Sequence, residues 1–281
     1  MIPAAPGRRF SLGFPPVRTL AELDDAYLPG MSVAPGPFLD EYAARSARAR
    51  RTLPWLDVAY GPSEPERLHF FPSPGRPLMV FVHGGYWQEL TAAESSFAAA
   101  DAVAGGWAFA ALGYGLAPAH RLDEIVAMVR RGLLWLRANE SGLGFDPDRI
   151  VLVGHSAGAQ LAAMCLDEVP VRAAVLLSGL YDLEPLLHTS IGPAIRLSED
   201  EAVRNSPVNL LRYGMPPLIA ARGADEPAGF AEQQDLLLAK AHEVGVPVDS
   251  LVVPDRHHFD LPLGLADPAD PLGQRVLAVL H

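Results

Sequence analysis

Apolar segments are evenly distributed from about residue 66 to 253, and within them apolar and polar positions follow two different periods. Runs such as PLMVFVH at 77–83 are almost continuously apolar, which is typical of a strand buried on both faces. The stretch 122–140 instead repeats apolar residues at helical spacing and is amphipathic. Strands are predicted at 67–71, 77–83, 107–112, 149–153, 171–178, 216–222 and 248–254, and helices at 38–51, 92–104, 122–140, 159–169, 230–245 and from Asp270-Pro271 onward.

This alternation predicts an α/β fold with a mostly parallel central sheet and helices on both faces. No linker interrupts the pattern, so we expect one catalytic domain over 61–281. The proline-rich, irregular residues 1–60 are expected to form an arm or cap packed on that domain. Functional groups of such sheets gather on the loops at the carboxyl ends of the strands, and we expect the catalytic residues there.

Charge and composition narrow the classes of partner. The formal net charge is −11, which argues against nucleic acid or an anionic membrane surface as a partner and favours a small-molecule substrate. Cys165 is the one cysteine, so a disulfide framework is excluded. No apolar run reaches the length of a signal peptide or a membrane span, and we expect a cytoplasmic protein.

The sequence GHSAG follows the strand predicted at 149–153. Small neighbours leave room for a sharp turn from strand to helix that exposes the hydroxyl of Ser156. The following helix would begin at Ala157, whose N–H is then free for a ligand. A glycine-rich connection with an incidental serine is the alternative, but the position between strand and helix favours a nucleophile.

A serine nucleophile needs a base and an orienting carboxylate. Asp225 and Glu226 follow one downstream strand, and His257 and His258 follow the next. The order serine, acid, histidine is that of the α/β-hydrolases. Asp225 is narrowly favoured over Glu226, and only one of the adjacent histidines can face the serine. Asp182, after an earlier strand, is a rival acid whose expected role is to cap a turn.

The sequence HGGYW follows the second predicted strand. Gly84 and Gly85 let backbone N–H groups approach a ligand closely, and with the N–H of Ala157 they could stabilise an oxyanion. Tyr86 and Trp87 could line a substrate pocket for an aromatic group, although ordinary core positions are the alternative. The sequence lacks the spacing of a metal hydrolase and of nucleotide-binding loops, so neither a metal nor a cofactor is expected.

HGGYW, GHSAGA, SGLYDLEPLLHTSI, SPVNLL and HHFD together resemble the kynurenine formamidases, or arylformamidases. These are α/β-hydrolases close to the hormone-sensitive-lipase group, and the resemblance runs from about Tyr60 to Asp260. It implies hydrolysis of N-formylkynurenine to kynurenine and formate without a cofactor.

The resemblance also implies roles for single residues. It places the nucleophile on Ser156, the acid on Asp225 and the base on His258, the histidine before Phe-Asp, and the oxyanion glycines on the Gly-Gly of HGGYW. Family members often have His where this chain has Gln160. Relatives with the same signature include esterases, so a carboxylesterase for short-chain aryl esters is the alternative function. A homodimer is possible.

Overall fold

A single eight-stranded sheet forms the centre of the molecule in a computed structural model that describes residues 18–280. Its strand order is β1-β2-β4-β3-β5-β6-β7-β8. The strands are β1 (Leu56–Ala59), β2 (Arg67–Phe71), β3 (Arg76–Val82), β4 (Ala108–Leu112), β5 (Phe145–His155), β6 (Ala173–Leu177), β7 (Leu218–Gly223) and β8 (Val248–Val253). Neighbours from β4 to β8 are parallel, whereas β2 runs antiparallel to both β1 and β4. The predicted, mostly parallel sheet is confirmed.

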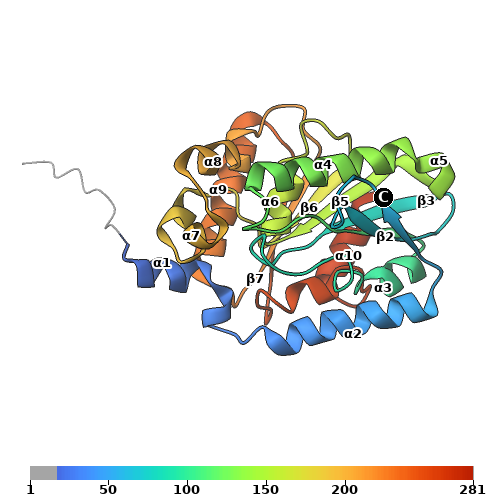
Figure 1. Cartoon of the computed structure of the whole chain (residues 1–281), viewed down its shortest axis with the longest axis horizontal. Coiled ribbons are helices and arrows are strands. Elements are labelled where there is room, and N and C mark those ends of the chain that lie inside the picture. Colours follow the sequence, from blue (N-terminus) through green and yellow to red (C-terminus); the bar gives the residue numbers. More distant parts are fainter. Residues whose placement is uncertain (1–17, 281) are drawn as a thin grey trace, which may run out of the picture.

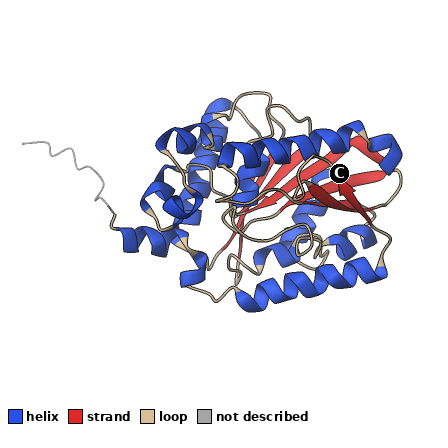
Figure 2. Cartoon of the chain, in the orientation of Figure 1, coloured by secondary structure: helices blue, strands red, loops and turns tan. Residues whose placement is uncertain are grey.

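Helices cover both faces of this sheet (Figures 1 and 2). The α-helices are α1 (Leu20–Tyr27), α2 (Gly36–Thr52), α3 (Ala99–Ala104), α4 (Leu122–Ala138), α5 (Glu140–Leu143), α6 (Ala157–Ala163), α7 (Ile191–Ile195), α8 (Glu199–Arg204), α9 (Ala228–Val244) and α10 (Pro271–Leu277). Short 3₁₀ helices are η1 (Pro29–Met31), η2 (Glu184–His188), η3 (Pro207–Asn209), η4 (Leu261–Gly264) and η5 (Ala278–Leu280). Within the described residues, no helix is both long and apolar enough to cross a membrane.

The side chains of the central strands divide between two hydrophobic cores. In β3, Leu78, Val80 and Val82 pack toward α4, α6 and α9, while Met79 and Phe81 pack toward α2, α3 and α10. Successive side chains of a strand point to opposite faces, so a strand covered on both faces must be apolar at every position. This explains the continuous apolar run that predicted the strand.

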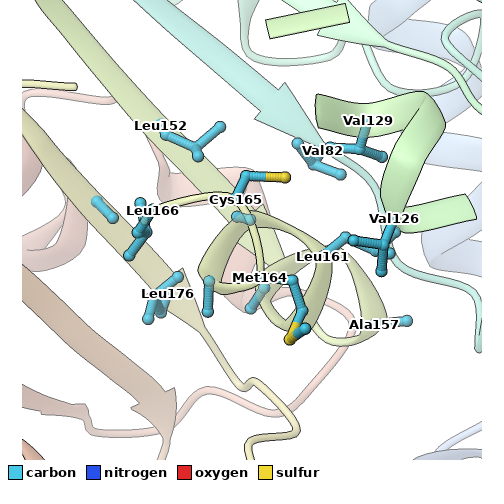
Figure 3. Close-up of a cluster of buried hydrophobic side chains, with 14 of the residues drawn as sticks. Val82, Val126, Val129, Leu152, Ala157, Leu161, Met164, Cys165, Leu166 and Leu176 are labelled. Atoms are coloured by element: carbon cyan, nitrogen blue, oxygen red, sulfur yellow. The ribbon is translucent and has the colours of Figure 1, made fainter. Parts of the chain in front are cut away.

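The helix α6 lies inside the first core and not at its edge (Figure 3). Leu161 of α6 and Cys165, which follows this helix, are fully buried, and Val126 and Val129 of α4 belong to the same core. A helix enclosed in this way has little freedom to move, because interiors are packed as densely as organic crystals. The turn that joins β5 to α6 is therefore held rigidly.

The N-terminal part of the chain is more regular than the sequence predicts. The helix expected at 38–51 is α2, but α1, whose Thr19 and Glu22 form a capping box, and β1 were missed. Because β1 pairs with β2, the segment before residue 60 contributes a strand to the sheet. Residues 1–17 of the predicted arm lie outside the described residues.

One predicted helix is shorter than expected. Residues 92–104 become helical only from Ala99, where α3 begins. Before it, the hydroxyls of Ser95 and Ser96 donate to the carbonyls of Thr91 and Ala92. Such side-chain hydrogen bonds to nearby backbone groups compete with a regular helix and explain the irregular start.

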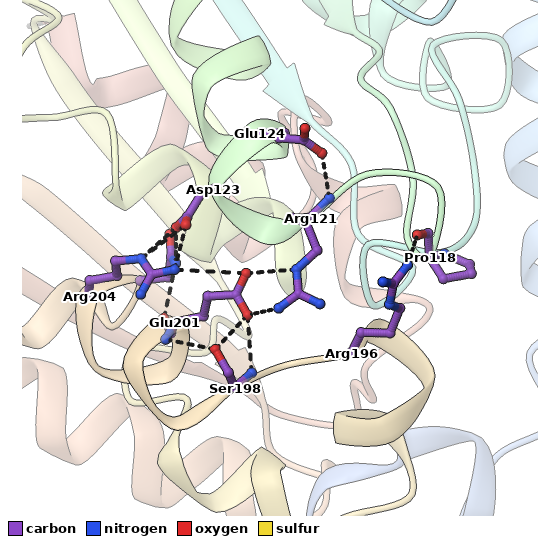
Figure 4. Close-up of polar contacts among 9 residues, drawn as sticks. Pro118, Arg121, Asp123, Glu124, Arg196, Ser198, Glu201 and Arg204 are labelled. Atoms are coloured by element: carbon purple, nitrogen blue, oxygen red, sulfur yellow. Dashed lines mark hydrogen bonds and ion pairs between the residues drawn. The ribbon is translucent and has the colours of Figure 1, made fainter.

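The segment that carries α7 and α8 is tied to the start of α4 by ion pairs (Figure 4). Glu201 of α8 is buried and accepts hydrogen bonds from Arg121, while Arg204 pairs with Asp123. Removing one partner of such a network leaves a buried charge unpaired, which is costly. This network holds α8 against the start of α4, and α7, which precedes α8 in the chain, borders the site described next.

Candidate active site

The turn between β5 and α6 holds Ser156 in an unusual backbone conformation. Its φ of 56° and ψ of −122° lie outside the regions that non-glycine residues prefer, and its N–H donates to the carbonyl of Leu177 at 2.8 Å. A Cβ on Gly154 would overlap the backbone of Gly158, and a Cβ on Gly158 would overlap the carbonyl of Val82. Close backbone packing therefore requires glycine at both positions flanking the serine.

His258 lies in the turn after β8 and lines the same cavity as Ser156. Its Nδ1 is 2.9 Å from Oε2 of Glu226, whose side chain is fully buried. The other carboxylate oxygen accepts hydrogen bonds from the hydroxyl of Ser178 and the N–H of Gly223, each at 2.6 Å. A carboxylate with these partners can hold an imidazole in one orientation and one tautomer.

Glu226 and not Asp225 therefore meets His258, and the predicted acid is corrected. Asp225 is exposed, and its backbone N–H donates to the carbonyl of Arg256. The two carboxylates follow one another in the tight turn after β7, where neighbouring side chains point in different directions. The side chain of Glu226 points toward His258, and its carboxylate reaches the imidazole.

His257 and Asp182 have structural roles. The Nδ1 of His257 accepts the N–H of Phe259, and its ring packs edge-on against Phe38, so this histidine does not border the cavity. The carboxylate of Asp182 accepts the N–H of Glu184, which is the turn-capping role expected of it.

The environment of Glu226 keeps it ionised. Burial by itself would raise the pKa of this carboxyl group, but the hydrogen bond and the charge of His258 oppose that effect. The hydrogen bonds from Ser178 and Gly223 lower the pKa further, and the net result is a pKa below the usual value. The group is thus an anion where an imidazolium would need a counter-charge.

The Gly-Gly loop after β3 lies directly beside the serine. A Cβ on Gly84 would be 3.0 Å from the Cβ of Ser156 and 2.9 Å from the carbonyl oxygen of His155. Gly85 has φ of 93°, lines the cavity and has no room for a side chain beside Glu89. Ala157 is the first residue of α6, so its N–H has no partner within the helix, and the predicted oxyanion donors remain a prediction.

The two aromatic residues of HGGYW lie in different surroundings. Tyr86 lines the cavity, and its hydroxyl donates to the carbonyl of Tyr27 in the N-terminal segment. Trp87 is fully buried in the first core and does not line the cavity, which corrects the prediction of a substrate contact. Its indole N–H donates to the side chain of Gln160 at 3.0 Å, and that amide donates in turn to the carbonyl of Asn205. Gln160 thus satisfies both buried groups.

A histidine inside the GHSAG turn joins the turn of Ser156 to that of His258. The Nε2 of His155 is 3.0 Å from the carbonyl oxygen of His258. A carbonyl can only accept, so Nε2 carries the proton in this contact. Burial, followed by the charge of His258, lowers the pKa of His155 well below its usual value, so the ring is neutral. The hydrogen bond fixes the turn that carries His258 to the turn that carries Ser156.

The cavity itself has a volume of about 230 Å³ and is lined by two walls. The first, here called the strand-end wall, comprises Gly85, Tyr86, Gln88, Glu89, Leu90, His155, Ser156, His258 and Phe259. The second, the N-terminal wall, comprises Leu28, Pro29, Gly30, Pro35, Leu39 and Tyr42, and Ile191 of α7 completes the lining. Sequence reasoning missed the N-terminal wall, because residues 28–35 are irregular and their contacts to the cavity are distant in the chain.

Comparison with known proteins identifies relatives of this chain. A BD-FAE family model matches residues 72–167. The kynurenine formamidase of Danio rerio is 34% identical over 79% of this chain and 80% of its own length. The corresponding enzyme of Salmo salar is 32% identical over 86% of each chain. The esterase LipQ of Mycobacterium tuberculosis is 26% identical over 81% of this chain and 60% of its own length.

Solved structures agree with the sequence comparison. A crystal structure from Silicibacter sp. TM1040, described as that of a thioesterase, superposes with a TM-score of 0.82 at 31% identity, over 92% of this chain and 99% of that one. An esterase of Pyrobaculum calidifontis superposes with a TM-score of 0.72 at 18% identity over 92% of this chain and 93% of its own, which shows a shared fold. The chain has the α/β-hydrolase fold, is a hydrolase, and belongs to the kynurenine formamidase family.

Proposed function

We propose that the protein is a serine hydrolase of aryl formamides, with N-formylkynurenine as its substrate, and that Ser156, His258 and Glu226 are its catalytic triad. The observation that carries the chemistry is the 2.9 Å contact between Glu226 and the imidazole of His258 in the cavity that Ser156 lines. The similarity to two kynurenine formamidases over most of both chains supports the choice of a formamide.

In the proposed acylation step, the Oγ of Ser156 attacks the formyl carbon while Nε2 of His258 takes the hydroxyl proton. The carbonyl oxygen becomes an oxyanion beside the N–H groups of the Gly-Gly loop and Ala157. Each such donor typically stabilises the transition state by roughly 3–4 kcal/mol. His258 then gives its proton to the aryl amine as the C–N bond breaks, which leaves a formyl ester on Ser156.

Deacylation uses the same groups in reverse. Water attacks the formyl ester while His258 accepts one of its protons, and the tetrahedral intermediate collapses to formate and the free serine. The anionic Glu226 stabilises the imidazolium in both halves of the reaction. A formyl group carries only hydrogen beyond its carbonyl carbon, so the apolar cavity remains available for the aryl leaving group.

A second candidate is a carboxylesterase of short-chain aryl esters. It is supported by the sequence similarity to the esterase LipQ, which extends over 81% of this chain. The triad is the same for both candidates, because an ester and a formamide pass through similar tetrahedral intermediates. The difference lies in the leaving group and in the size of the acyl group.

A substrate panel tests the assignment. We expect purified wild-type protein to hydrolyse N-formylkynurenine with a kcat/KM above that for p-nitrophenyl acetate, and Ser156→Ala to abolish both activities. Good cleavage of the acetate without any cleavage of N-formylkynurenine would replace the formamidase by the esterase. Unchanged hydrolysis in the folded Ser156→Ala variant would remove the serine mechanism altogether.

A further inference from the structure

The charges around the cavity are unevenly distributed. Apart from the two histidines, Glu89 is the one residue of the described lining whose side chain carries a charge at neutral pH, and the lining contains no Lys or Arg. Glu89 lies on the same loop as the proposed oxyanion glycines, and its N–H donates to the carbonyl of Gly85 at 3.1 Å. An acidic residue thus lines the cavity on the same loop as Gly85.

The carboxylate of Glu89 is free to meet a ligand. The residue is exposed, and within the part of the chain that the structure describes its side chain forms neither an ion pair nor a hydrogen bond. Two other glutamates are occupied: Glu94, close to Glu89 in the sequence, accepts from Thr91, and Glu226, buried behind His258, accepts from Ser178 and His258. Glu89 therefore has no structural partner that explains an acid at this position.

We infer that Glu89 selects substrates by charge, favouring an aryl leaving group that carries an ammonium group and disfavouring one that carries a carboxylate alone. This inference rests on the proposed function, since it concerns the leaving group of that reaction. A cation beside Glu89 gains an ion pair, whereas an anion finds no basic side chain in the described lining and meets a negative one. The formal net charge of −11 acts in the same direction on approaching ligands.

The inference narrows the substrate class among aryl formamides. N-Formylkynurenine carries an α-ammonium group beside its carboxylate, so the ammonium can pair with Glu89 while the carboxylate faces solvent. N-Formylanthranilate carries the carboxylate without an amine and would be a poor substrate. Because Glu89 is exposed, water screens the interaction, and we expect a selectivity of about threefold to fivefold, as is typical of exposed ion pairs.

The test uses three phenyl acetates that differ only in a para side chain ending in an ammonium, a hydroxyl or a carboxylate group. For the wild type we expect the KM to rise in that order, by about threefold to fivefold at each step. Glu89→Gln should bring the cation-to-neutral ratio close to one, and Glu89→Lys should reverse the order. Glu64→Gln removes the same charge from an exposed glutamate outside the cavity lining and should keep the wild-type ratios.

Two results would overturn the inference: ratios in Glu89→Gln that equal those of the wild type, or an equal change in Glu64→Gln, which would show a general field. Calorimetric binding of the three esters to Ser156→Ala, with and without Glu89→Gln, gives the same comparison without turnover. Failure to cleave N-formylkynurenine would remove the proposed substrate but would leave these charge ratios intact, so the two failures are distinguishable.

Discussion

The two walls of the cavity are built in different ways. The strand-end wall consists of turns that follow β3, β5 and β8, so its geometry is fixed by the hydrogen-bond register of the sheet. The N-terminal wall consists of η1 and the start of α2, segments outside the sheet. Two tyrosine hydroxyls join the walls: that of Tyr86 donates to Tyr27, and that of Tyr42 donates to Phe259.

This difference separates the proposed chemistry from the apolar part of substrate recognition. All groups that we propose to react or to stabilise charge belong to the strand-end wall or lie behind it, and a shift there would misalign the proton transfers. The N-terminal wall supplies mainly apolar contact surface. Substitutions in the N-terminal wall are therefore expected to change which leaving group is accepted, but not how the bond is broken.

The largest effect is expected from replacing His258, the proposed general base, which lies in the strand-end wall. His258→Gln removes proton transfer to and from Ser156 and should lower kcat by at least about 10⁴-fold, as for other members of a catalytic triad. The adjacent His257→Gln is the matched control, since this ring packs on Phe38 outside the cavity, and its kcat should stay within about threefold. Similar losses in both variants would show that the turn as a whole, and not one imidazole, matters.

The second prediction concerns how the free energy of unfolding depends on pH. Burial lowers the pKa of His83, which precedes the proposed oxyanion glycines, to about 4. The unfolded chain takes up a proton near the ordinary pKa of about 6.5 while the folded protein does not, so acid favours unfolding. Between pH 7 and pH 5 this group alone should lower the free energy of unfolding by roughly 2 kcal/mol.

Urea unfolding of wild type and His83→Gln at both pH values measures this contribution. The variant should lose less stability on acidification than the wild type, whatever its stability at pH 7. Residues 18–60 contain no histidine, so the N-terminal segment adds no such dependence. Equal losses in the two proteins would contradict the assignment of a buried neutral ring to His83.

The smallest effect is expected from the N-terminal wall. Leu39→Ala removes apolar surface that lines the cavity and should raise the KM for aryl substrates by about fivefold to tenfold with little change in kcat. Met31→Ala is the control, because Met31 lies in the adjacent 3₁₀ helix but is 65% exposed and does not line the cavity. A fall in kcat for Leu39→Ala would show that this wall takes part in the chemistry.

The sequence predicted best those features that depend on the sheet. Buried strands reveal themselves by continuous apolar runs, and parallel strands must bring their carboxyl ends to one edge. The positions of Ser156 and His258 on that edge therefore follow from the pattern of elements. The choice between Asp225 and Glu226 does not, because it depends on the direction of two neighbouring side chains within one turn.

Two further features could not be predicted for related reasons. Trp87 follows a glycine-rich loop, and only the partner on α6, the amide of Gln160, shows that its ring faces the core. The N-terminal wall has no hydrophobic period, since residues 28–35 are irregular and contact groups far along the chain. Patterns report local structure and burial, whereas these contacts are set by tertiary packing.

The proposed mechanism depends most on Glu226, which supports the imidazole from a buried position, and a matched pair of isosteric variants tests this role directly. We predict that Glu226→Gln lowers the kcat for N-formylkynurenine or, if that substrate is not cleaved, for p-nitrophenyl acetate by about 10³- to 10⁴-fold. Asp225→Asn should leave kcat within about threefold of wild type. The opposite result, with Asp225→Asn inactive and Glu226→Gln active, would contradict the triad.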